Sequence, residues 1–198
     1  MKKIGILIRS ENGKYENNYY INAVLKFGGE VILINDLDSV SSVLDKVSKL
    51  DGILLTGGDE VGRLDFFLIE YALNNNLKLL GICQGMQSMA LYGSSDKLVE
   101  IGDLSHSSDK KYAHYVDILS NSRFYELIKK NGILVNSHHL QTISRSSCFN
   151  VVGKSLDGLI EVVENSKHIF QIGVQWHPER MLDYDEVSNI IIDSFVNL

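Results

Sequence analysis

Short apolar runs alternate with amphipathic segments through the first half of the chain, and this order constrains the fold more than any other feature. The runs are typical of buried strands, and the segments between them repeat apolar residues at helical spacing. We expect strands at 4–8, 31–34, 53–55 and 77–82, and helices at 17–27, 39–50, 65–73 and directly after residue 83. This alternation predicts an α/β fold of three layers, with a mostly parallel central sheet and helices on both faces.

The second half of the chain is richer in short strand-like runs. These lie at 115–119, 133–135, 150–155, 159–164 and 169–175, and a helix is expected at 183–196. No internal repeat, low-complexity tract or linker separates the two halves. A chain of 198 residues fits one domain with a sizeable core. We therefore expect a single domain over 1–198 that includes a smaller β-rich part.

Composition and charge exclude several classes of protein. The 19 basic and 25 acidic residues give a net charge of −6, and lysines and arginines form no cluster, so we expect neither nucleic-acid nor membrane binding. Two cysteines cannot form a disulfide framework, and no apolar stretch approaches the length of a membrane span. The sequence therefore predicts a cytoplasmic protein with free thiols.

Cys83 lies between Gly81 and Gly85, directly after the expected strand 77–82. This spacing is the thiol form of a nucleophile elbow, in which flanking glycines permit a tight turn that exposes the side chain above the sheet. A helix after the turn directs backbone N–H groups and its positive dipole at the sulfur, which favours the thiolate. The N–H of Gln84 is then expected to donate to a developing oxyanion. Cys148 is not flanked by glycines in this way, so we expect no catalytic role for it.

His177 lies 94 residues further on (177 − 83) and follows the apolar run 169–172. Pro178 prevents that strand from continuing. Glu179 is two residues beyond the histidine, within reach of the imidazole, whose tautomer and orientation it could hold. A thiol, an imidazole and a carboxylate at strand ends are the parts of a nucleophilic acyl-transfer site. We therefore predict that Cys83, His177 and Glu179 are catalytic.

Five segments in the same order resemble class I glutamine amidotransferase-like proteins. Within that superfamily they are similar to the γ-glutamyl hydrolase branch (peptidase C26), which includes γ-glutamyl-γ-aminobutyrate hydrolase-like proteins. The segments are Leu54–Val61, Gly81–Gln87, Val135–Gln141, Asp157–Glu161 and Gly173–Glu179, and the spaced His106 and His114 also fit. The resemblance extends from about residue 4 to residue 179 and implies a flavodoxin-like sheet.

The resemblance also implies roles for individual residues. Cys83 would be the nucleophile, His177 the general base and acid, and Glu179 the third member of the triad. Backbone N–H groups of Gly58 and Gln84 would form the oxyanion hole. The substrate-binding residues would be Gly57, Gln87, Asn136, Ser137 and His138, with Gln87 contacting the γ-glutamyl moiety.

The activity implied is hydrolysis of a γ-glutamyl amide bond through a γ-glutamyl thioester, which releases glutamate and an amine. The amine could be γ-aminobutyrate, another amine, or a nucleotide amidate of the γ-glutamyl-CDP-amidate type. The alternative is a glutaminase subunit that delivers ammonia to a separate synthase partner. Gln84 replaces the arginine that such hydrolases often carry, which leaves the leaving group open. No cofactor is expected, and a homo-oligomer is compatible with the sequence.

His138 and His139 raise the question of a metal site. Neighbouring residues on a strand point to opposite faces, so at most one of the two can face any site. No spacing of cysteine and histidine elsewhere in the sequence is typical of zinc. We therefore expect no metal, with His138 as the residue that faces the cleft.

Overall fold

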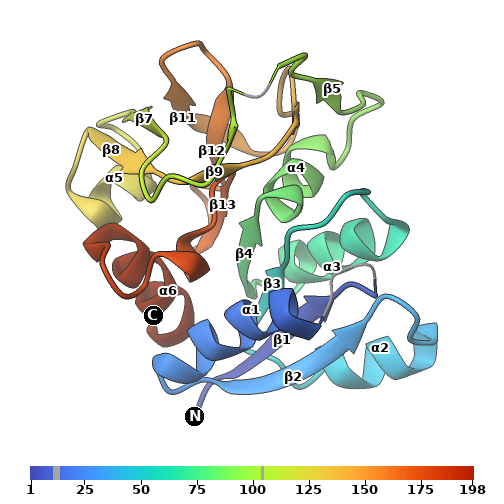
Figure 1. Ribbon diagram of the computed structural model, residues 1–198. Coiled ribbons are helices and arrows are strands. Elements are labelled where there is room, and N and C mark those ends of the chain that lie inside the picture. Colours follow the sequence, from blue (N-terminus) through green and yellow to red (C-terminus); the bar gives the residue numbers. More distant parts are fainter. Residues whose placement is uncertain (11–13, 104) are drawn as a thin grey trace.

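The computed structural model describes residues 1–10, 14–103 and 105–198. Within these residues a nine-stranded sheet runs through the molecule in the order β2-β1-β3-β4-β13-β12-β11-β7-β8 (Figure 1). Its strands are β1 (Lys3–Ile8), β2 (Glu30–Asn35), β3 (Gly52–Leu55), β4 (Lys78–Ile82), β7 (His114–Ile118), β8 (Gly132–Val135), β11 (Asn150–Ser155), β12 (Ile160–Glu164) and β13 (Gln171–Val174). The five strands from β2 to β13 are parallel. The other four continue the same sheet with antiparallel pairing, so the β-rich part is an extension of the parallel sheet.

Six α-helices cover the two faces of this sheet in the described part of the chain. They are α1 (Lys14–Lys26), α2 (Val40–Val47), α3 (Arg63–Asn74), α4 (Gln84–Leu91), α5 (Arg123–Ile128) and α6 (Glu186–Asn197). Buried residues of α1, α5 and α6 belong to one hydrophobic core, and those of α2, α3 and α4 to a second (Figure 1). The strands contribute to both cores because their side chains alternate between the two faces: Ile6 joins the first core and Leu7 the second. The predicted three-layer α/β architecture is confirmed.

Short elements that the sequence analysis did not predict lie beside the main sheet. They are β5 (Val99–Glu100), β6 (Ser107–Ser108), β9 (Ser137–His138), β10 (Gln141–Thr142) and the 3₁₀ helix η1 (Pro178–Arg180). Strand β6 pairs with β9, and β5 pairs with β10, each in an antiparallel ribbon. These ribbons carry the segment 137–142 past the catalytic edge of the sheet. Helix α5 was also missed.

Capping side chains fix where two of the predicted helices begin. Ser39 accepts a hydrogen bond from the N–H of Ser42, as expected for the residue that precedes α2. The last helix begins at residue 186 instead of 183, because the carboxylate of Asp185 accepts a hydrogen bond from the N–H of Ser188 at 2.7 Å. No helix among the described residues is long and apolar enough to span a bilayer.

The central strands bring three loops to one edge of the sheet. Strand β4 pairs in parallel with β13, with Ile82 opposite Val174, and with β3, with Gly81 opposite Leu55. The residues that follow each strand therefore emerge side by side at the carboxyl edge, where α/β folds bind ligands. This register places the 56–58 loop, Cys83 and the segment before His177 next to one another.

Candidate active site

Cys83 occupies a strained turn between β4 and α4. Its φ of 54° and ψ of −109° are rare for a residue other than glycine and mark local backbone strain. A side chain at Gly85 would place its Cβ 2.2 Å from the carbonyl oxygen of Leu55, so only glycine allows α4 to pack this closely against β3. The strand, turn and helix have the form predicted for a nucleophile elbow.

The sulfur of Cys83 is mostly buried, with 7% of the residue exposed, and lies beside two glutamines. The Nε2 group of Gln175 donates a hydrogen bond to Sγ at 3.6 Å. Gln87 donates in turn to Oε1 of Gln175 at 3.1 Å and to the carbonyl of Gln141 at 2.9 Å. The sequence analysis missed Gln175, although its position two residues before His177 in the same motif was a usable signal.

The imidazole of His177 lies between Glu179 and Cys83. Its Nδ1–H donates to Oε1 of Glu179 at 2.7 Å, and the ring also hydrogen-bonds Cys83. Burial lowers the pKa of His177, but the negative charges of Glu179 and Cys83 together outweigh it and raise the pKa to about 10. The ring therefore holds a proton at neutral pH.

Asn136 fixes the backbone of His177. Its Oδ1 accepts from the N–H of His177 at 2.8 Å, and its Nδ2 donates to the carbonyl of His177 at 2.9 Å. Ser137 is fully buried and donates to the carbonyl of His106 at 2.7 Å. The sequence analysis expected Asn136 and Ser137 to line the substrate cleft. The structure places both behind it, because their hydrogen-bonding groups face the protein's own backbone.

The loop after β3 lies against both catalytic side chains. A Cβ on Gly57 would lie 3.1 Å from Cε1 of His177 and 3.4 Å from Cβ of Cys83. The N–H of Gly57 donates to the hydroxyl of Tyr20 at 3.0 Å, so it is directed away from the sulfur. Gly58 lines the cavities on both sides of Cys83. The N–H of Gly58, rather than that of Gly57, is therefore the one suited to an oxyanion.

Tyr20 on α1 is a second residue that the sequence analysis missed. Burial raises the pKa of Tyr20 well above its usual value, and the charges of Glu179 and Cys83 add to the effect. Its hydroxyl therefore stays neutral and holds the Gly57 N–H. In the sequence Tyr20 cannot be distinguished from an ordinary core residue of an amphipathic helix.

A buried ion pair between Arg9 and Asp65 supports the 56–58 loop. The guanidinium of Arg9 donates to the carbonyl of Thr56 at 3.2 Å and pairs with Asp65 at 2.6 Å. The side chain of Gln84 is also buried, and its Nε2 donates to the carbonyl of Glu60. The Gln84 side chain thus ties the loop to α4, and only its backbone N–H remains as a contribution to an oxyanion hole.

Two cavities meet at the sulfur of Cys83. One has a volume of about 370 Å³ and includes Gln87 and Gln141 in its lining, and the other, of about 220 Å³, includes Tyr20, His177 and Arg180. Gly58 and His138 line both. A larger hollow of about 500 Å³ lies beside α2 and α3 and is not lined by Cys83. The two smaller cavities are therefore the candidate subsites for a substrate that reacts at Cys83.

The rings of His138 and His139 contact different neighbours, but both residues line the cavity that contains Gln87, so the expectation that at most one of them faces the site was wrong. The ring of His138 lies edge-on to that of His177, with centroids 6.0 Å apart. Burial lowers the pKa of His138, and the charge of His177 lowers it further, so His138 is neutral beside the charged catalytic ring. The ring of His139 is directed toward His106, with 3.2 Å between its Nε2 and Nδ1 of His106.

Comparisons with known proteins agree with this geometry. The family model described as Peptidase C26 matches residues 7–63 and 62–179. The γ-glutamyl-γ-aminobutyrate hydrolase PuuD of Escherichia coli K12 is 30% identical over 211 residues, covering 89% of this chain and 83% of that protein.

Two solved structures share the fold. A GMP synthase protein from Thermoplasma acidophilum superposes with a TM-score of 0.72 at 21% identity, covering 99% of this chain and 92% of that one. The glutaminase domain of Trypanosoma brucei CTPS, with bound acivicin, gives a TM-score of 0.74 at 14% identity, covering 99% of this chain and 91% of that one. These structures share the fold, and the family model and the relative show that the chain is a hydrolase that belongs to the peptidase C26 family.

Proposed function

We propose that this protein is a cysteine hydrolase of γ-glutamyl amides. The observation that carries the proposal is the convergence of Cys83, His177 and Glu179 at the meeting point of two cavities. A thiol beside a protonated imidazole is suited to acyl transfer from an amide. The similarity to a protein named as a γ-glutamyl-γ-aminobutyrate hydrolase suggests that the acyl group is γ-glutamyl.

In the proposed mechanism the proton of the Cys83 thiol resides on His177, and Sγ attacks the γ-carbonyl carbon. The N–H groups of Gly58 and Gln84 stabilise the oxyanion of the tetrahedral intermediate, with each donor contributing roughly 2.7–4 kcal/mol. His177 then gives its proton to the leaving nitrogen, the C–N bond breaks, and a γ-glutamyl thioester remains. A water molecule deprotonated by His177 attacks the thioester, which releases glutamate and restores the thiolate.

The other predicted site residues divide into two groups under this proposal. Glu179 holds the imidazolium of His177 through Nδ1, and Asn136 and Ser137 act as positioning residues rather than substrate contacts. Gln87 and His138 line the cleft and are the groups available to contact substrate. Gly57 contributes a surface without a side chain at the junction of the two cavities.

The charge of the cavities favours a leaving amine with few negative groups. Among the described residues that line the two cavities, Arg180 is the one arginine or lysine. It already pairs with Glu16, and its guanidinium lies 5.4 Å from the ring centroid of Tyr19. Because Arg180 already pairs with Glu16, it suits a leaving amine with a single carboxylate, such as γ-aminobutyrate. A nucleotide amidate would bring a diphosphate to a site with no second cation of this kind.

The test is a panel of γ-glutamyl amides incubated with the purified chain, with free glutamate as the readout. The panel contains γ-glutamyl-γ-aminobutyrate, other γ-glutamyl amines, γ-glutamyl-CDP-amidate and glutamine. We expect release from γ-glutamyl amines by the wild type and by Cys148→Ser, and none by Cys83→Ala. No release from any γ-glutamyl amide would contradict the proposal. Ammonia release from glutamine that begins only when a second protein is added would support the glutaminase alternative.

A further inference from the structure

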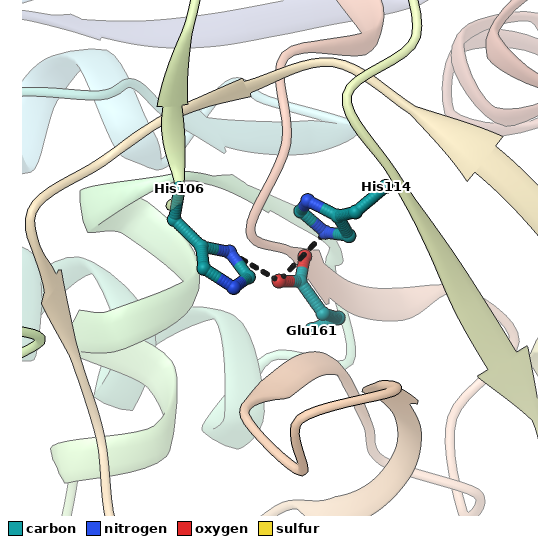
Figure 2. A group of neighbouring side chains, drawn as sticks. All are labelled: His106, His114 and Glu161. Carbon is teal, nitrogen blue, oxygen red and sulfur yellow. Dashed lines mark hydrogen bonds and ion pairs between the residues drawn. The ribbon is translucent and has the colours of Figure 1, made fainter. Parts of the chain in front are cut away.

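Three histidines and a glutamate that the proposed mechanism does not use converge beside the active site. His106 directly precedes β6, His114 begins β7, His139 directly follows β9, and Glu161 lies in β12. Figure 2 shows the carboxylate of Glu161 pointing between the rings of His106 and His114. Ligand atoms of these three residues all lie within 4.8 Å of one another.

Four of the six separations among the donor atoms of His106, His114, His139 and Glu161 are close to those of a tetrahedral metal site. Oε1 of Glu161 lies 3.1 Å from Nε2 of His114, 3.6 Å from Nδ1 of His106 and 3.8 Å from Nε2 of His139. Nδ1 of His106 and Nε2 of His139 are 3.2 Å apart. A tetrahedral Zn²⁺ with bonds of about 2.0–2.1 Å separates its ligand atoms by about 3.3 Å. Each of these four separations is therefore close to the value that such an ion requires.

The outer nitrogens of two rings are already oriented as metal-bound histidines require. Nδ1–H of His139 donates to the carbonyl of Gln141 at 2.9 Å. Nε2–H of His106 donates to Oδ2 of Asp157 at 2.9 Å. Metal-binding histidines usually donate their second N–H to a carbonyl or a carboxylate in this way. The ring nitrogen that remains on each residue faces the shared centre.

Hydrogen bonds within the described part of the protein do not give every polar atom of this cluster a partner. Glu161 is fully buried, and its Oε2 has no hydrogen-bond partner within the described part of the chain. Nδ1 of His114 also has no partner there, but it is the outer nitrogen of a ring whose Nε2 faces Glu161, so an ion at the centre would leave it exposed to other partners. A buried carboxylate requires a compensating cation or a full set of donors, and a metal ion would supply the cation.

We propose that His106, His114, His139 and Glu161 bind one Zn²⁺ ion in a structural site. Three imidazoles and one carboxylate are typical zinc ligands, and a set of four leaves no open position for chemistry. The ion would join the segments around β6, β7, β9 and β12. The ion would hold His139 directly after β9 and would thereby restrain its neighbour His138, whose ring packs against that of His177. This proposal replaces the sequence-based expectation of no metal.

The experiment measures metal binding in the full chain with Cys83→Ala as background, because the catalytic thiol and His177 could themselves bind zinc. Protein freed of metal by a chelator is titrated with Zn²⁺, with bound metal and melting temperature as readouts. Co²⁺ is titrated in parallel for its visible absorption. We expect one ion per chain, a higher melting temperature with metal, and a cobalt spectrum typical of four-coordinate nitrogen and oxygen ligands.

Variants assign the ion to this cluster. Glu161→Gln and His139→Gln should abolish stoichiometric binding. Asp157→Asn removes the carboxylate that accepts from His106 and also from the hydroxyl of Ser155, and changes at such partners of a ligand typically weaken metal affinity by about 10- to 100-fold. Asp157 is half-exposed, so this variant tests the site even if the buried substitutions prevent folding. His138→Gln is the matched control, because the ring of His138 packs against that of His177 and not against the cluster, and it should bind Zn²⁺ as the background does.

Two results would overturn the proposal. The first is a folded background protein that takes up no stoichiometric Zn²⁺ and whose melting temperature changes neither with chelator nor with added metal. The second is equal affinity in the background, in Asp157→Asn and in Glu161→Gln, which would mean binding elsewhere on the surface. Neither result depends on hydrolysis of a γ-glutamyl amide.

Discussion

Asn136 holds both backbone polar groups of His177, accepting from its N–H at 2.8 Å and donating to its carbonyl at 2.9 Å. The imidazole proposed as the general base extends from His177, which lies between the end of β13 and η1, where no strand or helix fixes the main chain. The side chain of Asn136, directly after β8, therefore makes the backbone hydrogen bonds that a strand or helix would otherwise supply. Precise placement of the ring depends on this contact because acyl transfer requires correct alignment of the reacting groups.

We predict that Asn136→Ala lowers kcat by at least about 10-fold and destabilises the fold by about 1–3 kcal/mol, because two buried backbone groups lose their partner. Steady-state kinetics and urea unfolding measure the two effects. Asn189→Ala is the matched control, since Asn189 also bonds backbone carbonyls but lies on α6. A variant with wild-type kcat would contradict the positioning role of Asn136.

Tyr20→Phe should impair catalysis while leaving the core filled. The change removes the acceptor of the Gly57 N–H, so the loop that precedes Gly58 loses one of its fixed points. We expect a loss of about 1–3 kcal/mol in unfolding free energy and a fall in kcat of about 10-fold. Thermal unfolding and kinetics on a γ-glutamyl amide check both values. Tyr125→Phe, on α5, is the control; equal kinetic effects in the two variants would refute the assignment.

Gln175→Leu tests the hydrogen bond to the sulfur. Hydrogen bonds to charged groups contribute about 1.5–3 kcal/mol, so loss of this donor should slow alkylation of Cys83 by iodoacetamide about 10- to 100-fold near neutral pH. The measurement is the rate of alkylation as a function of pH. Gln171→Leu removes a buried amide at the start of β13 whose partners are Asn165 and the carbonyls of Ala72 and Leu77, so the alkylation rate of this variant should be unchanged. Similar slowing in both variants would point to a general loosening of the strand.

The raised pKa of His177 makes stability depend on pH. Burial alone would lower this pKa, but the charges of Glu179 and Cys83 raise it to about 10, against about 6.5 in the unfolded chain. The stabilisation from the charged ring is therefore complete below about pH 6.5 and is lost as the pH rises toward about 10. The difference in unfolding free energy between wild type and His177→Gln should shrink over this interval. Urea unfolding at about pH 6, 8 and 10 measures it; a constant difference would show that the ring is neutral in the fold.

Local patterns in the sequence were sufficient to predict the parallel half of the sheet and the elbow. The strand before Cys83 and the glycines around it are contiguous in sequence, so their geometry follows from short-range rules. The sequence analysis placed the run before His177 in the β-rich half and did not predict that it pairs in parallel with the strand before Cys83. In the structure β4 and β13 are parallel neighbours.

Features that depend on long-range contacts could not be predicted in the same way. Asn136 and Ser137 belong to a motif expected to face the cleft, yet which way each side chain points depends on β9 and its pairing with β6. These strands are two residues long, too short for a periodic pattern. Tyr20 and Arg9 support the 56–58 loop from segments far away in sequence. The histidines around Glu161 come from separate segments without a recognisable spacing.

The central claim is that Cys83 is the nucleophile toward a γ-glutamyl amide, and an electrophilic glutamine analogue tests it most directly. Intact-protein and peptide mass spectrometry would follow labelling while glutamate release from a γ-glutamyl amine is measured in parallel. We predict one label per chain, on Cys83, with activity lost in proportion to labelling and with Cys83→Ala both unlabelled and inactive. Glutamate release that persists in Cys83→Ala, or that survives complete labelling of Cys83, would contradict the account.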